Sequence, residues 1–268
     1  MLLMTPLFQQ IITYALLPTV ALTGGGVVAL FIRFGAQVRS AILHFAAGVV
    51  FSVVAVEILP DVVRLHDPLL TAVGFGAGIG LMLLIRRLTQ SPEEASTKLE
   101  ADGTTTAAAG KLSDASTLDV DASGGFPLTF LLAIGVDIFI DGLLLGIGFA
   151  AGAKEGILLA LALGVEVLSL GLATATSLTE NGVSRPRIVR LLLGLSALFF
   201  LSTVGGATLL HNLPETSLDV VLSFGLAALL FLVTEELLVE AHEGEEKPWM
   251  TATFFAGFLL FLILGMMA

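Results

Sequence analysis

The sequence contains no cysteine and few charged residues. Without cysteine the chain has no disulfide framework, no thiolate metal site and no cysteine nucleophile. Charged residues make up 13% of the chain, against about 25% in an average soluble domain. The formal net charge is −11 and no basic stripe is present, which excludes a nucleic-acid-binding protein. The first residues also lack a positively charged segment, so we expect no cleaved signal peptide.

Long apolar runs take the place of the missing charge. Hydrophobic residues make up 56% of the chain, and the mean hydropathy is +0.99. Apolar stretches of about 20 residues recur from end to end, and each is long enough to cross a bilayer as a helix. We therefore predict an all-α, polytopic membrane protein with one domain, residues 1–268. The expected spans are about 10–33, 40–60, 68–88, 126–150, 155–178, 188–210, 218–241 and 250–267.

One long polar interval interrupts this pattern, at about 90–125. It is rich in alanine, threonine, serine, glycine and aspartate and shows no apolar periodicity. These features predict a flexible loop. The rest of the chain has no tandem repeat of fixed period.

The basic residues predict the orientation in the membrane. With the N-terminus outside, the loops after the first, third, fifth and seventh spans face the cytoplasm. Of the twelve lysine and arginine residues, only Arg64 and Lys154 then lie outside. Such a bias is typical of cytoplasmic loops, and it predicts a multi-pass inner (plasma) membrane protein with both termini outside and the polar loop inside. The residues on the cytoplasmic side are Arg33, Arg39, Arg86, Arg87, Lys98, Lys111, Arg185, Arg187, Arg190 and Lys247.

Six acidic residues lie inside the apolar spans. A carboxylate at the centre of a bilayer costs about 2.5–3.5 kcal/mol on insertion scales, so such residues usually face the bundle interior and serve a function. We therefore treat them as candidate site residues. They are Glu57, Asp137, Asp141, Glu166, Glu235 and Glu236.

Three of these acids are expected at the same depth. Asp137 and Asp141 are four residues apart, so both point to one face of their helix. They lie about 16–22 Å into the fourth span, and Glu166 lies about 16 Å into the fifth, which runs the opposite way. The three carboxylates should therefore meet near the midplane of the membrane.

The remaining acids extend this central group toward both surfaces. Glu57 lies on the outer side, and Glu235, Glu236 and Glu240 lie on the inner side. Neighbouring carboxylates repel one another unless protons or a cation neutralise them. A divalent cation would accept their oxygens as ligands and remove the repulsion. In the alternative, the acids are protonated and merely hold helices together through hydrogen bonds.

Two histidines near the inner acids are further candidates. His242 follows Glu240 closely, and His44 lies four residues into the second span from the cytoplasmic side. Both could serve as ligands where the cation leaves the path. The alternative for His44 is an ordinary histidine at the membrane interface.

The same stretches resemble the helices of the ZIP (Zrt/Irt-like) family of divalent metal transporters. "HFAAGVVFSVVAVEILPDVV" is similar to the second helix of that family, and "DIFIDGLLLGIGFAAG" to the fourth. The resemblance implies that Glu57 stands at or next to a family histidine. It also implies that Asp137 takes a histidine position, Ile138 an asparagine position and Asp141 an acid position.

The fifth and seventh helices carry the rest of the resemblance. "LALGVEVLSLGLATA" is similar to the fifth, where anchoring on Gly171 puts Glu166 at the first ligand position. "TEELLVEAHEGEEK" is similar to the seventh, with Glu235 at a histidine, Glu236 and Glu240 at acids, and His242 at the final histidine. Membership would imply eight helices, both termini outside, and a homodimer.

The chain also departs from the family pattern. The fifth helix has Val167, Ser169 and Leu170 where the family has an acid, a proline and a second glutamate. The paired metal centre of the family would then shrink to one centre built on Asp137, Asp141 and Glu166. A one-residue shift of register would instead put Glu166 at the neighbouring acid position. Carboxylates in place of histidines favour harder ions, so Mn²⁺ and Fe²⁺ are candidates beside Zn²⁺, which carboxylates also bind.

These observations predict a transporter that moves a divalent cation into the cytoplasm by alternating access. We expect the metal ion as the transported substrate and the lipid bilayer as the other partner. We expect no cofactor. One alternative is a ZIP-like protein that binds metal as a sensor and has lost transport. A membrane enzyme is disfavoured, because Asp137 and Asp141 share one helix and the Gly-x-Gly-Asp signature of intramembrane aspartyl proteases is absent.

Overall fold

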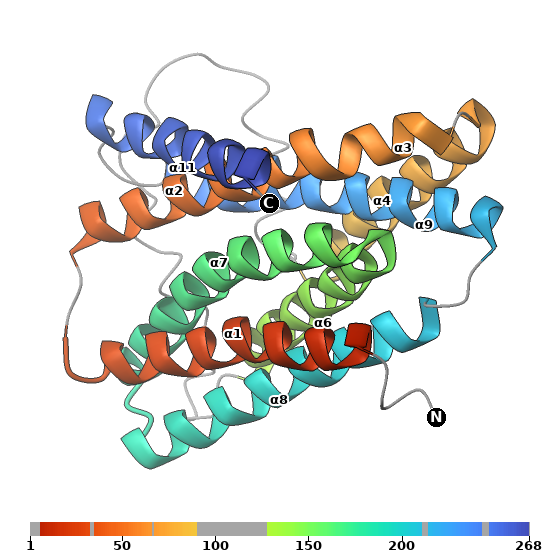
Figure 1. Ribbon diagram of the computed structural model, residues 1–268. Helices are drawn as coiled ribbons and strands as arrows, with labels where there is room; N and C mark the ends of the chain where they lie inside the picture. Colours follow the sequence, from red (N-terminus) through yellow and green to blue (C-terminus); the bar gives the residue numbers. More distant parts are fainter. Residues whose placement is uncertain are drawn as a thin grey trace, which may run out of the picture.

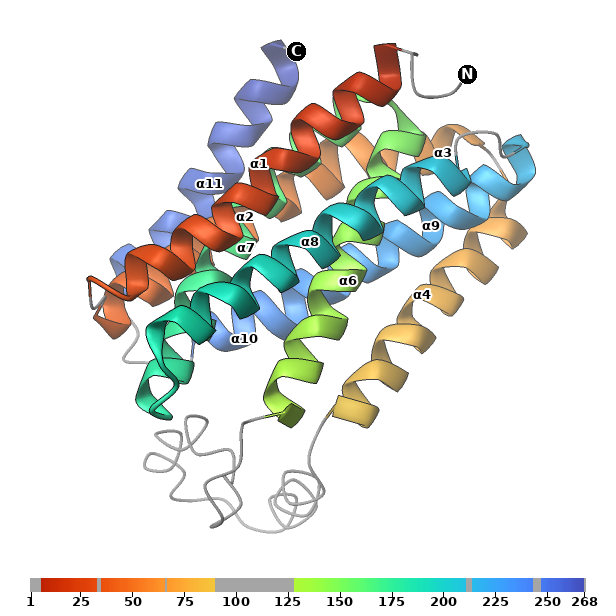
Figure 2. The same cartoon turned by 90° about the horizontal axis from the view of Figure 1, so that it is seen from below.

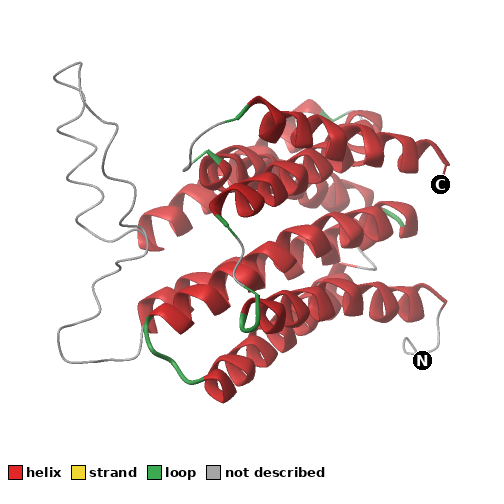
Figure 3. Cartoon of the chain, turned by 90° about the vertical axis from the view of Figure 1, so that its left-hand side faces the viewer, coloured by secondary structure: helices red, strands yellow, loops and turns green. Residues whose placement is uncertain are grey.

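The computed structural model describes residues 6–32, 35–65, 67–89, 128–210, 214–242 and 247–267. The predicted flexible loop at about 90–125 lies outside these ranges. Within them the chain is built of helices and short connections, without strands (Figure 1, Figure 3). The α-helices are α1 (Pro6–Ala29), α2 (Ala36–Val53), α3 (Leu59–Leu65), α4 (Pro68–Thr89), α6 (Leu128–Ala151), α7 (Ala153–Glu180), α8 (Arg185–Leu210), α9 (Glu215–Phe231), α10 (Leu238–Ala241) and α11 (Pro248–Met267).

Two of the long helices contain a π-helical segment. Segment η2 (Val54–Ile58) joins α2 to α3, and η4 (Leu232–Leu237) joins α9 to α10. With these joints, eight helices are long and apolar enough to cross a membrane. The prediction of an all-α, multi-pass membrane protein is confirmed. Both π-helical segments carry acids, Glu57 in η2 and the Glu235–Glu236 pair in η4, and π-bulges are frequent at functional sites.

The helices form two groups that pack against each other (Figure 1, Figure 2). In the first group α1 packs on α7 and α8, and α6 packs on α8 and α7. In the second, α2 packs on α11 and α4 packs on α9, with α10 against α2. The groups meet mainly where α2 lies along α7 and where α6 crosses α9. The core of the bundle therefore includes a long seam between the two groups.

Two glycines let α6 pack closely on α8. A Cβ atom at Gly142 would lie 2.6 Å from the Phe199 carbonyl oxygen, and one at Gly146 would lie 2.7 Å from the Ala207 nitrogen. Glycine at both positions thus permits the close approach of α6 to α8. With that face committed to α8, Asp137 and Asp141 on another face of α6 are directed toward α7 and η4.

Candidate metal path

A cavity of about 350 Å³ lies at the seam between the two helix groups. Four acids line it: Asp137 from α6, Glu166 from α7, Glu236 from η4 and Glu240 from α10. Of the described residues around it, one, Arg86 of α4, is basic. The other lining residues are apolar: Leu43, Met82, Ile85, Ala133, Ile134, Ile140, Leu170, Leu232 and Leu237.

Asp141 lies one helical turn deeper than this cavity and is almost completely buried, at 1% exposure. Neither of its carboxylate oxygens has a hydrogen-bond partner among the described residues, and neither has Oε2 of Glu166. The two carboxyl groups are close enough to interact electrostatically, and Asp137 interacts with both. Buried polar atoms almost always have a partner, so these oxygens form a donor set that a cation would complete.

Asp137 and Glu236 meet across the seam. Their carboxyl groups lie close enough to interact electrostatically. Two neighbouring carboxylates repel each other unless a proton or a cation neutralises the charge. The pair therefore places like charges where α6 of the first helix group faces η4 of the second.

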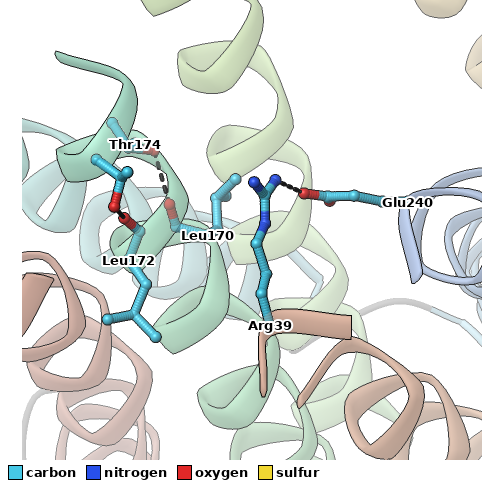
Figure 4. A network of polar contacts seen from close by, with 6 residues as sticks. Arg39, Leu170, Leu172, Thr174 and Glu240 are labelled. Carbon is cyan, nitrogen blue, oxygen red and sulfur yellow. Dashed lines mark hydrogen bonds and ion pairs between the residues drawn. The ribbon is translucent and has the colours of Figure 1, made fainter. Parts of the chain in front are cut away.

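Two arginines pair with acids at the end of the cavity formed by α4, α2 and α10. Arg39 of α2 forms an ion pair with Glu240 (Figure 4), and Arg86 forms one with Glu235. Glu235 does not line the cavity but borders a separate groove beside α4. Consecutive helical residues point to different faces, so Glu236 faces the cavity and Glu235 turns away.

Beyond Glu166, the part of α7 that lines the cavity is regular α-helix. Leu170 lines the cavity, and its carbonyl oxygen accepts a hydrogen bond of 2.7 Å from the Thr174 hydroxyl (Figure 4). The hydroxyl is thereby satisfied within its own helix. Thr174 is not among the residues that line the cavity.

The two candidate histidines lie next to each other, with ring centroids 4.8 Å apart. His44 is buried, and its Nδ1 atom lies 2.9 Å from the Ser40 carbonyl oxygen. A carbonyl oxygen only accepts, so Nδ1 carries the hydrogen in this contact. His242 is exposed, and its Nδ1 atom contacts the Leu238 carbonyl. Neither histidine is among the described residues that line the cavity.

Glu57, the predicted outer member of the path, lies apart from the other acids. Its carboxylate is 9% exposed and forms an ion pair of 3.4 Å with Nζ of Lys154. It also lies beside Gly265 of α11, away from the cavity lining. The sequence offered a signal for this pair, because both residues were expected near the outer surface and Lys154 was one of only two basic residues there.

The acids lie close to one another but do not form a complete metal-binding site among the described residues. Within the described residues, no three histidine or acidic side chains converge so as to hold a metal ion together. The assignment of Asp137, Asp141 and Glu166 as ligands stays a prediction. No signal in the sequence pointed to the ion pairs of Arg39 and Arg86, nor to the burial of Asp219, an acid of α9 that is 2% exposed.

Comparison with known proteins gives a partial match to a zinc transporter. No protein-family profile matches the chain. Over 140 residues it is 31% identical to the zinc transporter GufA of Myxococcus xanthus, a stretch that covers 52% of this chain and 55% of that protein. The chain thus spans about half the length of this curated relative. The chain is a multi-pass helical membrane protein similar, over about half its length, to a zinc transporter.

Proposed function

We propose that the protein is a divergent ZIP-like transporter that moves a divalent metal cation across the membrane into the cytoplasm. The observation that carries the proposal is the group of buried carboxylates at the seam, where Asp141 and Glu166 leave three oxygens without a partner. Uncompensated carboxylates in the membrane interior are costly. A divalent cation offsets that cost by accepting the oxygens and balancing their charge. The similarity to GufA supports the same function.

In this proposal Asp137, Asp141 and Glu166 bind the cation first. Asp137 and Glu166 are reached from the cavity, and Asp141 lies one turn deeper. The acids sit close together without converging on one point, so a bound ion would draw them inward. In this proposal metal binding also displaces any proton that Asp137 or Glu236 holds.

Movement of the two helix groups would then expose the ion to the other side of the membrane. The first group packs closely through α1, α6, α7 and α8, the second consists of the α2–α11 and α4–α9 pairs, and the acids sit on the seam between the groups. The cavity extends from Glu166 to Arg86 and Glu240, near the ends of α4 and α10 that are predicted to face the cytoplasm. That direction leads past the inner acids and fits release into the cytoplasm. The inner-membrane location, outside termini and homodimer are part of the same proposal.

The choice of ion follows from the ligands. An all-carboxylate centre suits harder divalent ions more than an imidazole centre does, so we propose Zn²⁺, Mn²⁺ and Fe²⁺ as cargo. Zn²⁺ is the first to test, because carboxylates are ordinary zinc ligands and the curated relative is named for zinc.

Uptake of radioactive Zn²⁺ into proteoliposomes tests the proposal. We expect flux with the wild-type protein and its loss in the Asp137→Ala plus Asp141→Ala variant. Glu180→Gln is the matched control, since Glu180 is exposed and outside the cavity lining, and it should retain most of the flux. Equal flux in the double variant and the wild type would overturn the assignment.

A second candidate is a protein that binds metal without transporting it. The lack of three convergent ligands among the described residues and the valine, serine and leucine on α7 at family ligand positions favour it. Zn²⁺ binding measured beside the uptake assay separates the two candidates. A sensor would bind Zn²⁺ but show no flux.

A further inference from the structure

Asp219 is a buried carboxylate that the metal path does not use. It lies in α9, is 2% exposed, and faces α4, where the Thr71 hydroxyl donates a hydrogen bond of 3.2 Å to its Oδ1 atom. The Ser223 hydroxyl donates a second hydrogen bond of 3.3 Å to the same oxygen. The other oxygen, Oδ2, is buried and has no partner among the described residues.

This group is far from the central acids. Asp219 and Glu236 are seventeen residues apart along the continuous helix formed by α9 and η4. At a rise of about 1.5 Å per residue their backbones are about 25 Å apart. Asp219 lies at the opposite end of α9 from the cavity and does not line it. Its charge therefore needs its own compensation.

No basic side chain in the described part of the chain forms an ion pair with Asp219. The recorded ion pairs of the acids join Asp61 to Arg64, Glu57 to Lys154, and two inner glutamates to Arg39 and Arg86. A lone carboxylate in an apolar bundle carries one negative charge. One positive charge balances it, whereas a divalent ion would leave an excess charge buried.

The surrounding donors are all oxygens. Thr71 and Ser223 each use their hydrogen toward Oδ1 and keep oxygen lone pairs. Together with Oδ2 they offer three oxygen donors to a small hard cation. A proton on Oδ1, donated to the Thr71 or Ser223 hydroxyl, would neutralise the charge too. That compensation would respond to pH and not to sodium, which separates it from a bound cation.

A groove of about 480 Å³ between α3, α4 and α9 borders the site, and Thr71 and Asp67 line it. Asp219 is not among its lining residues, so an ion in the groove would meet the Thr71 hydroxyl first. Behind Thr71 the two helices are tightly apposed, because Gly74 of α4 packs against the Val220 carbonyl of α9.

We propose that Asp219, Thr71 and Ser223 form an oxygen-only binding site for a small monovalent cation of the sodium type, at the end of the α4–α9 pair opposite to the acid-lined cavity. The bound ion stabilises the pairing of these two helices. The site goes beyond the proposed metal transport and does not depend on it.

Thermal unfolding of the purified protein in detergent tests this site. NaCl replaces choline chloride at constant ionic strength and pH, with a chelator present so that divalent metals do not contribute. A bound ligand stabilises the folded state in proportion to its occupancy, so we expect a melting temperature that rises by several degrees and saturates. Asp219→Asn should abolish the rise, and Ser223→Ala and Thr71→Val should move its midpoint to several-fold higher sodium.

Asp61→Asn is the matched control. Asp61 lies toward the same end of the bundle and is already paired with Arg64, so this variant should keep the full sodium effect. Sodium-23 NMR line broadening with the wild-type protein gives a second readout that does not depend on any variant folding. No sodium-dependent rise, an equal rise in Asp219→Asn, or a stability that follows pH and ignores sodium would each overturn the proposal.

Discussion

Asp137 of α6 and Glu236 of η4 line the same cavity at the seam between the two helix groups and lie close enough to interact electrostatically. Each residue belongs to a different group, so the interaction joins the parts that would move in an alternating-access cycle. Two carboxylates this close repel each other unless a proton or a cation neutralises the charge. The relationship links the charge of the site to the arrangement of the helices.

The proximity of these two acids predicts that metal binding releases protons. Deprotonated carboxylates bind the metal, so Zn²⁺ should displace any proton that Asp137 or Glu236 holds. Isothermal titration calorimetry in buffers of different ionisation enthalpy counts the protons released. Glu236→Gln should release fewer protons per bound Zn²⁺ than the wild type, whereas Glu180→Gln, at an exposed position outside the cavity lining, should match it. An unchanged proton count in Glu236→Gln would contradict this interaction.

Arg86 is expected to help the metal leave. Its guanidinium pairs with Glu235 and acts electrostatically on Glu236 at the cavity wall. In Arg86→Gln the inner acids lose this positive charge and should hold a cation more tightly. We expect a several-fold lower apparent KM for Zn²⁺ uptake together with a lower maximal rate.

Arg87→Gln provides the control for that experiment, because Arg87 is adjacent in sequence but exposed and outside the cavity lining. Its kinetics should match the wild type. If both variants behave alike, the guanidinium of Arg86 has no special part in release.

The Glu57–Lys154 ion pair is predicted to stabilise the bundle. Lys154→Met would leave Glu57, which is 9% exposed, without its cationic partner. The cost of an unsatisfied buried polar group is about 1–3 kcal/mol, to be seen in thermal unfolding in detergent. Combining Lys154→Met with Glu57→Gln should recover most of the loss. Additive losses in the double variant would show that the two side chains do not interact.

Histidine in place of Asp137 should change the choice of metal. Imidazole suits Zn²⁺ better than Mn²⁺, so Asp137→His should raise the ratio of Zn²⁺ to Mn²⁺ uptake in a competition assay. Leu132→Ala, an exposed position on the same helix, should leave the ratio unchanged. A ratio that stays at the wild-type value in Asp137→His would place the selective step away from this residue.

The sequence was informative where one local pattern determines the structure. Apolar runs predicted the all-α membrane fold, because helix length and hydropathy alone decide whether a segment crosses a bilayer. The four-residue spacing of Asp137 and Asp141 placed both on the face that the structure turns toward α7 and η4. Depth along the helices likewise brought Glu166 to their level.

Other features depend on how helices rotate against one another, and the sequence did not predict them. Glu235 and Glu236 are adjacent and equally acidic, yet only Glu236 lines the cavity. Glu57 has the right depth for the path but pairs with Lys154 on another helix. Asp219 stood at the edge of a predicted span, and only packing against α4 shows that it is buried.

X-ray absorption spectroscopy of the Zn²⁺-loaded protein tests directly whether carboxylates bind the metal. We predict a first shell of oxygen atoms at about 2.0–2.2 Å from the metal, and loss of that bound Zn²⁺ in the Asp137→Asn plus Asp141→Asn variant. A first shell dominated by imidazole nitrogen, or the same spectrum in the double variant, would contradict it.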